Sequence, residues 1–276
     1  MPASQAEKAR RFRALHERPG AFVIPNPWDA GTARLLAHLG FEALATTSAG
    51  YAFSAGRQDG SIGRDEMLAH TAALAAATEL PVSADLENGY AGSLAGIAET
   101  YLLAARTGLA GASIEDATGD AHAPIFDHAL AVDRVRAAVD AVKSLPFPFT
   151  LTARAENYLH GRPDLNDTIR RLQAFQEAGA DVLYAPGLQS RQDIAAVVRS
   201  VDRPVNVLAG AHCSVAELSE LGVRRISVGS ALCRAALGAF LSAAKEMKEQ
   251  GRFTFANDAT DYRGLMAIFT SPKSAQ

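Results

Sequence analysis

The sequence predicts an α/β protein with the (β/α)8, or TIM, barrel fold. Short apolar or β-branched runs alternate with longer alanine- and leucine-rich stretches of helical spacing, and this alternation repeats eight times. The short runs lack a polar alternation, as parallel strands buried on both faces do. A doubly wound open sheet shares this pattern and is the alternative architecture. The predicted strands are Ala21–Pro25, Ala43–Thr47, Val82–Leu86, Gly111–Glu115, Phe149–Ala153, Asp181–Ala185, Pro204–Leu208 and Arg225–Val228.

The first helices are defined by their apolar spacing and by their end signals. A helix over about Ser4–Arg18 is expected to precede the first strand as an appendage to the barrel. After that strand, Leu35, Leu36 and Leu39 share one face of a helical segment that Gly40 ends. The first predicted strand and the helix that follows it therefore form the first strand-and-helix unit of the barrel.

The later helices carry similar signals. Apolar residues recur at i, i+3 and i+7 along Leu130–Val139, which predicts an amphipathic helix. Ser214 and Glu217 have the spacing of a capping box, and Gly222 stands where that helix should stop. No proline- or serine-rich linker or charge block divides the chain, so one domain is expected over residues 1–276, with the tail after Gly251 as a second appendage.

Composition limits the kinds of partner. The 276 residues are 48% hydrophobic and 21% charged, which is typical of a folded core and excludes a disordered protein. The formal net charge of -3 offers no basic field for nucleic acid or an anionic membrane, so a small-molecule partner is expected. Only two cysteines occur, the first 20 residues lack the apolar core of a signal peptide, and no run of about 18 apolar residues could span a bilayer. A cytoplasmic protein is therefore expected.

Acidic residues gather where predicted strands end. In a parallel barrel these ends meet at one rim, so Asp59, Asp85, Glu87 and Glu115 could converge there. Four clustered carboxylates repel one another unless a cation offsets them, and all-oxygen ligation favours Mg²⁺ or Mn²⁺. Asp85 and Glu87 are two residues apart and would share a face of a regular strand. The alternative is that each acidic residue is a solvated helix cap.

Arg154 ends an apolar strand, where an unpaired charge would be costly to bury. It could clamp a substrate carboxylate with two parallel hydrogen bonds, or pair with a structural acid such as Glu156. The small residues before Gly50 suit backbone N–H groups that approach a carboxylate, although an ordinary tight loop has the same composition.

Taken together, these segments resemble the isocitrate lyase/phosphoenolpyruvate mutase superfamily. The resemblance extends from about residue 15 to 245, in order and at the family's spacing. It rests on Asn26–Gly31, Thr47–Gly50, Gly56–Gly60, Ala84–Tyr90, Ser113–Asp116, Thr152–Arg154 and Leu221–Gly229.

The resemblance implies a (β/α)8 barrel whose last helix is exchanged between subunits of a homodimer or homotetramer. It also implies Mg²⁺ and a small 2-oxo acid substrate or its enolate. By position, Asp85 resembles the direct metal ligand, and Arg154 resembles the arginine that clamps the substrate. The residues that reach the metal through waters would be Asp59, Glu87 and Glu115, and those that receive the substrate carboxylate would be Thr47, Ser48 and Ala49.

The loop after the fourth strand departs from the resemblance. The isocitrate and methylisocitrate lyases carry Lys-[Lys/Arg]-Cys-Gly-His there, whereas Asp116–Ile125 contains neither lysine nor cysteine. His122 could replace the missing acid, or it could simply be a solvated loop histidine. A glutamate that the lyases carry after the sixth strand is replaced by Pro186 and Gly187, which indicates a differently shaped pocket.

Three functions remain open from the sequence. The leading hypothesis is an Mg²⁺-dependent lyase that acts on a 2-oxo acid or a related di- or tricarboxylate, by C–C cleavage or decarboxylation through a metal-bound enolate. The second is a C–P bond enzyme of the phosphonopyruvate hydrolase or phosphoenolpyruvate mutase type. The third is a 2-oxo acid binding protein without catalytic activity.

Overall fold

A computed structural model describes residues 2–211 and 213–270. All eight predicted strands are present, and each pairs in parallel with its neighbour in the order β1-β8-β7-β6-β5-β4-β3-β2. Between β1 and β2 the Ala45 N–H donates to the Pro25 carbonyl at 3.1 Å, so the sheet nearly closes on itself. The barrel prediction is confirmed, because β1 and β2 stand at the two ends of this order and an open sheet would not bring them together. The strands are β1 (Phe22–Ile24), β2 (Leu44–Ala45), β3 (Val82–Asp85), β4 (Gly111–Glu115), β5 (Thr150–Arg154), β6 (Val182–Tyr184), β7 (Val205–Leu208) and β8 (Arg225–Ser227).

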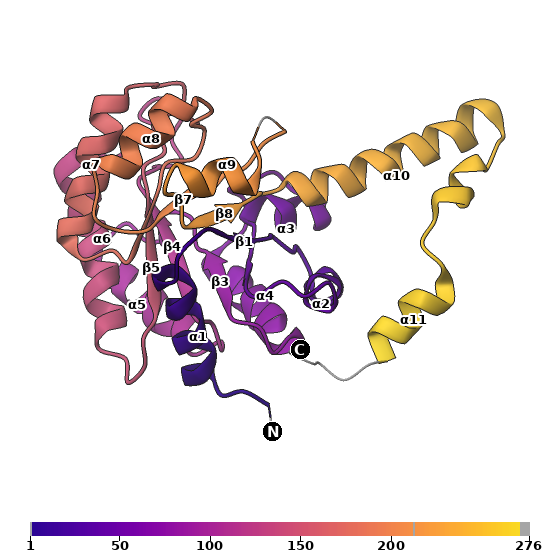
Figure 1. Ribbon diagram of the computed structural model, residues 1–276, viewed down its shortest axis with the longest axis horizontal. Helices are drawn as coiled ribbons and strands as arrows, with labels where there is room; N and C mark the ends of the chain where they lie inside the picture. The colour runs from indigo at the N-terminus through magenta and orange to yellow at the C-terminus, as the bar shows by residue number, and fades with distance from the viewer. Residues whose placement is uncertain (1, 212, 271–276) are drawn as a thin grey trace.

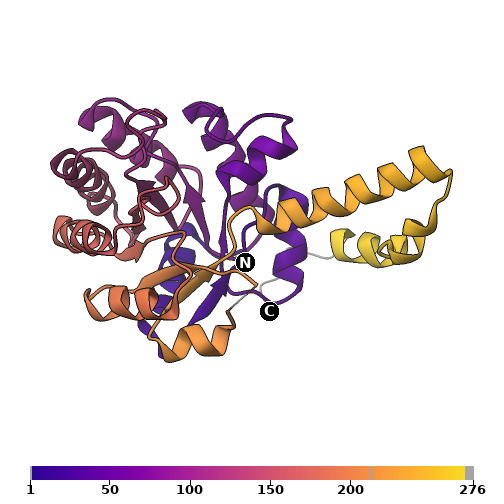
Figure 2. The ribbon, with the colours of Figure 1, turned by 90° about the horizontal axis from the view of Figure 1, so that it is seen from above.

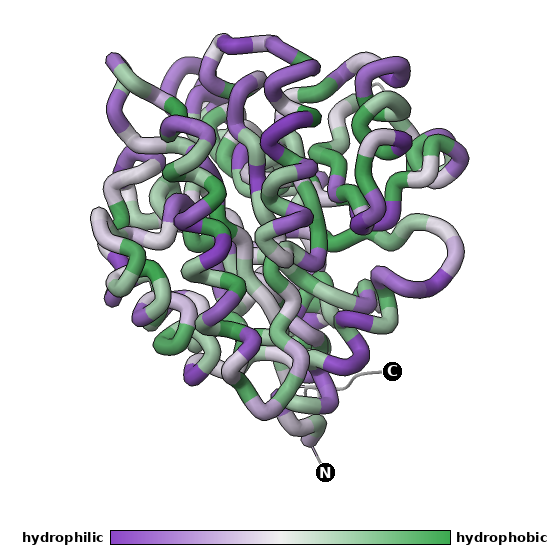
Figure 3. The backbone as a smooth tube through the Cα atoms, turned by 90° about the vertical axis from the view of Figure 1, so that its left-hand side faces the viewer, coloured by the Kyte–Doolittle hydropathy of each residue, from purple (hydrophilic) through white to green (hydrophobic). Residues whose placement is uncertain are grey.

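Helices cover the outside of this sheet, and the view from above shows the ring that they form (Figures 1 and 2). Hydrophilic residues alternate with hydrophobic ones along the outer helices (Figure 3), which is the pattern of helices with one buried face. The helices are α1 (Gln5–Glu17), α2 (Ala30–His38), α3 (Ser48–Ser54), α4 (Arg64–Ala77), α5 (Leu94–Ala105), α6 (His128–Lys143), α7 (Leu165–Ala178), α8 (Arg191–Arg199), α9 (Val215–Glu220), α10 (Ala231–Gln250), the 3-10 helix η1 (Thr254–Asp258) and α11 (Tyr262–Thr270).

Helix α1 closes the amino-terminal end of the barrel. Ser4 caps it in a capping box with Glu7, as expected for a stable helix start. Phe12 is wholly buried in a cluster with residues that begin β1, and it lies against Gly111 at the start of β4, where an added Cβ would approach the Phe12 ring to 3.0 Å. Access to the barrel interior is therefore from the carboxyl ends of the strands.

The predicted helix ends are largely confirmed. Gly40 follows α2 with φ +83°, and Ser214 and Glu217 form the predicted capping box of α9, with Gly222 after it at φ +89°. Leu39 differs from the expected helical face, because it lies just beyond α2 and is 71% exposed.

The tail after β8 leaves the barrel. Figures 1 and 2 show α10 extending away from the sheet and α11 turning back toward α2, where Arg34 Nη2 donates to the Ile268 carbonyl at 3.3 Å. In the part of the chain that the structure describes, no helix combines the length and apolar character needed to cross a lipid bilayer. The tail exposes apolar side chains at Leu232, Leu237, Phe240, Leu241, Met247, Phe253, Tyr262 and Met266.

Candidate active site

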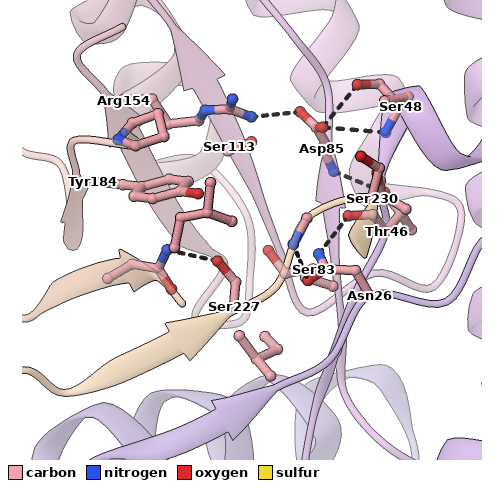
Figure 4. Close-up of a pocket in the computed structure, with 18 of the residues that line it drawn as sticks. Asn26, Thr46, Ser48, Ser83, Asp85, Ser113, Arg154, Tyr184, Ser227 and Ser230 are labelled. Atoms are coloured by element: carbon pink, nitrogen blue, oxygen red, sulfur yellow. Dashed lines mark hydrogen bonds and ion pairs between the residues drawn. The ribbon is translucent and has the colours of Figure 1, made fainter. Parts of the chain in front are cut away.

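A cavity of about 200 Å³ lies within the barrel, and all eight strands contribute to its wall. The interiors of such barrels are usually filled by branched apolar side chains. Here several interior positions are small and polar, among them Ser83, Ser113 and Ser227, which leaves space for a ligand (Figure 4). The predicted residues Thr47, Ser48, Ala49, Asp59, Asp85 and Arg154 all line this cavity.

Asp85 ends β3 at the centre of the site. Its Oδ2 accepts hydrogen bonds from the Ser48 hydroxyl at 2.9 Å and the Ser48 N–H at 3.2 Å, and its own N–H donates to Thr46 Oγ1 at 2.8 Å. Its Oδ1 accepts from Arg154 Nη1 at 2.9 Å (Figure 4). Ser48 and Arg154 therefore already hold the Asp85 carboxylate in place when no ligand is bound.

Arg154 ends β5 and pairs with three carboxylates. Nη1 contacts Asp85, Nη2 lies 3.2 Å from Glu115 Oε2, and Nε donates to Glu156 Oε1 at 2.8 Å. The guanidinium side chain is only 15% exposed. The predicted pairing with Glu156 is confirmed, and two further partners are added to it. A clamp on substrate would therefore exchange some of these contacts for the substrate carboxylate.

One arginine does not offset all the negative charge at this rim. Burial, followed by the charges of Asp85 and Asp59, raises the pKa of Glu87 to about 7. Burial raises the pKa of Glu115 well above its usual range even though Arg154 opposes the shift. Burial and the Asp85 carboxylate likewise raise the pKa of Asp59. The site therefore has the charge balance of a centre that accepts a cation.

The geometry of Glu87 corrects one expectation. Strand β3 ends at Asp85, and Glu87 lies beyond it with φ +47°, a left-handed conformation that is uncommon outside glycine. The two side chains therefore do not share a face of a regular strand. Glu87 Oε1 is buried and makes no hydrogen bond of ordinary geometry among the described residues, although the Tyr90 phenol is near enough to lower the pKa of Glu87. An orphaned carboxylate oxygen beside two other carboxylates fits a bound cation or its water.

These residues fit a divalent ion held by few direct ligands. Among residues 2–211 and 213–270, no three acidic, histidine or cysteine side chains converge to form a complete protein cage. Mg²⁺ commonly keeps several waters and takes one or two carboxylates, which agrees with Asp85 as the direct ligand and the other acidic residues at longer range. Such an ion would replace a hydrogen bond that Asp85 now accepts.

Glu87→Gln should stabilise the metal-free protein at pH 8. Because the folded-state pKa of Glu87 is above its ordinary value of 4.5, its burial destabilises the fold progressively as pH rises from 4.5 to about 7, and fully above that. Removing the charge should therefore raise stability by on the order of 2 kcal/mol at pH 8, and by much less at pH 5.

Thermal unfolding in EDTA at the two pH values measures this difference. In saturating Mg²⁺ the order should reverse, because the wild-type carboxylate then faces a cation. A lower Tm for Glu87→Gln at pH 8 in EDTA would contradict the charge imbalance.

Known proteins resemble this chain in sequence and fold. Residues 12–248 match the family described as phosphoenolpyruvate phosphomutase. A crystal structure described as a "putative lyase/mutase" from Burkholderia cenocepacia J2315 is 62% identical, with a TM-score of 0.95 over 97% of this chain and 98% of that one. The chain belongs to the isocitrate lyase/phosphoenolpyruvate mutase superfamily.

Two curated members of the superfamily are more distant. The 2-methylisocitrate lyase of Halalkalibacterium halodurans is 28% identical over 74% of this chain and 68% of its own length. The oxaloacetate decarboxylase of Pseudomonas savastanoi pv. phaseolicola is 26% identical over 90% of this chain and 87% of its own. The superfamily is enzymatic, and these relatives are lyases, so this chain is an enzyme of the same superfamily.

The loop after β4, where lysine and cysteine are absent, folds back on itself. An isolated antiparallel bridge joins Ala117 to Ile125, and the Thr118 N–H donates to the Pro124 carbonyl at 2.9 Å, which folds the loop on itself. His122 is exposed in this loop, and its N–H donates to Asp120 Oδ1 at 2.9 Å. It is not among the side chains that line the cavity. The structure therefore does not bring His122 together with the other predicted site residues.

Sequence reasoning also missed residues inside the strands. Tyr184 on β6, Asn206 on β7 and Arg225 on β8 line the cavity, and each is less than one-tenth exposed. Asn26 follows β1 and connects it to both neighbouring strands of the barrel. Its Oδ1 accepts from the N–H groups of Val228 and Gly229 after β8, both at 2.9 Å, and its Nδ2 donates to the Thr46 carbonyl after β2 at 3.0 Å. Polar residues within otherwise apolar strands were the signal that could have found this group.

Proposed function

We propose that this superfamily member is an Mg²⁺-dependent lyase, with Mn²⁺ as a possible substitute, that breaks a C–C bond of a 2-oxo acid or a related di- or tricarboxylate. The observation that carries the proposal is the surplus of buried carboxylates around Asp85 at the mouth of a small polar cavity. Such a surplus suits a hard divalent cation, and the cavity size suits a small metabolite, since drug-sized ligands occupy roughly 300–1,000 Å³.

The chain's own residues would orient the substrate. Thr47 caps α3, and Ser48 and Ala49 follow it at the cavity wall, where they would receive the carboxylate next to the 2-oxo group. Arg154 would hold the other side of the same anionic group with its forked N–H donors. When bound at Asp85, Mg²⁺ would supply positive charge that favours an enolate over the neutral keto acid.

The enolate then needs a proton when the C–C bond has broken. Cys233 is buried beneath Gly50, whose carbonyl lies 3.5 Å from its sulfur, and Cys213 follows β7. Neither cysteine lines the cavity. We propose His122 as the proton donor in a form in which the Asp116–Ile125 loop covers the mouth, because an imidazole is a common general acid and this loop follows β4 at the rim of the site.

The test is a product screen. Purified protein with Mg²⁺ is incubated with oxaloacetate, 2-oxoglutarate, methylisocitrate, isocitrate and phosphonopyruvate, and products are identified by ¹H, ¹³C and ³¹P NMR. The proposal expects C–C cleavage of one of the carboxylic acids, with no turnover in EDTA. A phosphorus-containing product would establish the C–P alternative, which the match to the phosphoenolpyruvate phosphomutase family favours. Tight binding without any product would establish a binding protein.

We also propose a homodimer or homotetramer in which α10 packs against a second copy of the chain. On α10, Phe240 is 68% and Leu241 57% exposed, and large exposed apolar surfaces usually mark an interface. Replacing both with glutamate should reduce the mass measured by light scattering to that of one chain. Ser242→Glu, on the same exposed helix, is the matched control and should leave the assembly intact. An unchanged mass for the double variant would exclude α10 as the interface.

A further inference from the structure

Arg225 forms part of the cavity wall without an acidic partner. It begins β8, is 6% exposed, and donates from Nε to Asn206 Oδ1 at 2.9 Å. Its Nη1 is buried with no hydrogen-bond partner, and no aspartate or glutamate of the described residues forms an ion pair with it. Burial lowers the pKa of Arg225 to about 10, so the guanidinium is still charged at neutral pH.

The other deeply buried arginines are compensated by their surroundings. Arg171 pairs with two aspartates, at 3.1 and 2.7 Å. Arg134 donates to two backbone carbonyls at 2.7 and 3.0 Å, and its guanidinium lies 4.1 Å from the centre of the Phe126 ring, although its Nε has no hydrogen-bond partner. Arg225 alone among these three faces the cavity. A buried guanidinium without an anion is costly, and an anion from outside the chain would offset that cost.

The neighbours of Arg225 present hydrogen-bond donors to the same space. Arginine has no acceptor, so the Arg225 contact fixes the Asn206 amide with its oxygen toward Nε and its Nδ2 toward Ser227 Oγ, at 2.9 Å. Because Ser227 Oγ accepts from Asn206, the Ser227 hydroxyl can donate its own proton into the cavity, and the Tyr184 phenol forms part of the same wall. Burial raises the pKa of Tyr184 to about 12, so the phenol keeps its proton. The chain of hydrogen bonds thus ends on donors that an anion can accept from.

We propose that Arg225, Ser227 and Tyr184 form a second anion subsite, which binds the distal carboxylate of a dicarboxylic 2-oxo acid. This inference rests on the proposed function, in which the 2-oxo acid end lies at Ser48 and Arg154. Both ends border one cavity of about 200 Å³, so a single small molecule can reach both. The subsite would select dicarboxylates over 2-oxo acids with an apolar tail, because the latter leave the buried guanidinium unpaired.

The test compares pairs of ligands that differ only at the distal group. Binding of oxaloacetate is compared with 2-oxobutyrate, and 2-oxoglutarate with 2-oxovalerate, by calorimetry at saturating Mg²⁺. Wild-type protein should bind at least one dicarboxylate more than tenfold more tightly than its matched monocarboxylate. Arg225→Gln, which can still donate to Asn206, should weaken that dicarboxylate at least tenfold and change the monocarboxylate less than threefold.

A second readout separates ligand binding from a structural role. Since Arg225 has no acidic partner, Arg225→Gln should not lower the Tm of the ligand-free protein, whereas loss of a structural ion pair would lower it. Arg225→Lys should retain part of the preference because it keeps the charge. Should the glutamine variant fail to fold, Ser227→Ala gives the same comparison and should weaken the dicarboxylate selectively.

The outcomes distinguish this inference from the proposed function. Equal wild-type affinity for both members of each pair would overturn the subsite and leave the 2-oxo acid lyase standing. Absence of binding by all four acids would overturn the subsite, and if methylisocitrate and isocitrate also give no product, the proposed function is overturned with it. Tighter binding of phosphonopyruvate than of oxaloacetate would overturn the assignment of a carboxylate to the subsite. Equal losses for both members of a pair in Arg225→Gln would also overturn it.

Discussion

Asp85→Ala is expected to abolish measurable binding of divalent ions. Asp85 is the carboxylate around which Ser48 and Arg154 are arranged, and the remaining acidic residues offer only longer-range, water-mediated contacts. Calorimetry with Mn²⁺ should show binding to wild-type protein and no heat of binding to the variant. Catalytic turnover on whichever acid proves to be the substrate should disappear with it.

Two controls make this result specific. Asp85→Asn keeps an oxygen for Ser48 but removes the charge, and it should also lose the ion. Asp133→Ala removes a half-exposed carboxylate on α6 that does not line the cavity. This variant should bind Mn²⁺ as wild type does. Undiminished Mn²⁺ affinity in Asp85→Ala would show that the ion binds elsewhere.

Arg154→Lys is expected to weaken binding of a 2-oxo acid by about 2–5 kcal/mol, the usual effect of breaking a buried charged pair. This corresponds to roughly 30- to 4,000-fold in the dissociation constant. Lysine keeps the charge but cannot present a planar fork, and it cannot contact Asp85, Glu115 and Glu156 at once as Arg154 does. The measurement is made at saturating Mg²⁺, so that a lost metal is not mistaken for a lost clamp.

Arg171→Lys is the matched control for this change. Arg171 is also a buried arginine paired with carboxylates, Asp116 and Asp167, but it does not line the cavity. Its substitution should lower Tm without changing the affinity for 2-oxo acids. If Arg154→Lys instead loses Tm and keeps full affinity and turnover, Arg154 is an ion-pair partner of the fold and not a substrate clamp.

The strands of this barrel could be predicted from the sequence because parallel strands buried on both faces form short, nearly continuous apolar runs. All eight lie within one or two residues of their expected ends. Helix α3 could not be predicted in this way, because Ser48–Ser54 is only seven residues long and is mostly small residues without a clear apolar period. The close approach there needs Gly50, since an added Cβ would lie 2.6 Å from Thr47 Cγ2.

The site residues that lie at or just after the ends of strands could be predicted from the sequence. Asp85, Asp59 and Arg154 were found because polar residues after apolar strands are conspicuous. The left-handed turn at Glu87 and the three-way pairing of Arg154 depend on tertiary contacts that spacing does not encode. Arg225 was missed because it lies at the start of a strand, where the direction of its side chain into the barrel becomes evident only once the neighbouring strands are placed.

The seam between β1 and β2 has a consequence for how the barrel moves. No strand ladder joins them, and the closure rests on one backbone hydrogen bond and on Asn26. Local opening is easiest where the fewest such bonds must break, so this seam is the weakest part of the wall. A ligand that touches Ser48 beside β2 and Arg225 on β8 would span the seam from inside. Occupancy of the cavity and rigidity of the wall are therefore coupled, and a ligand that bridges the seam stabilises the closed barrel by binding it in preference to the open form.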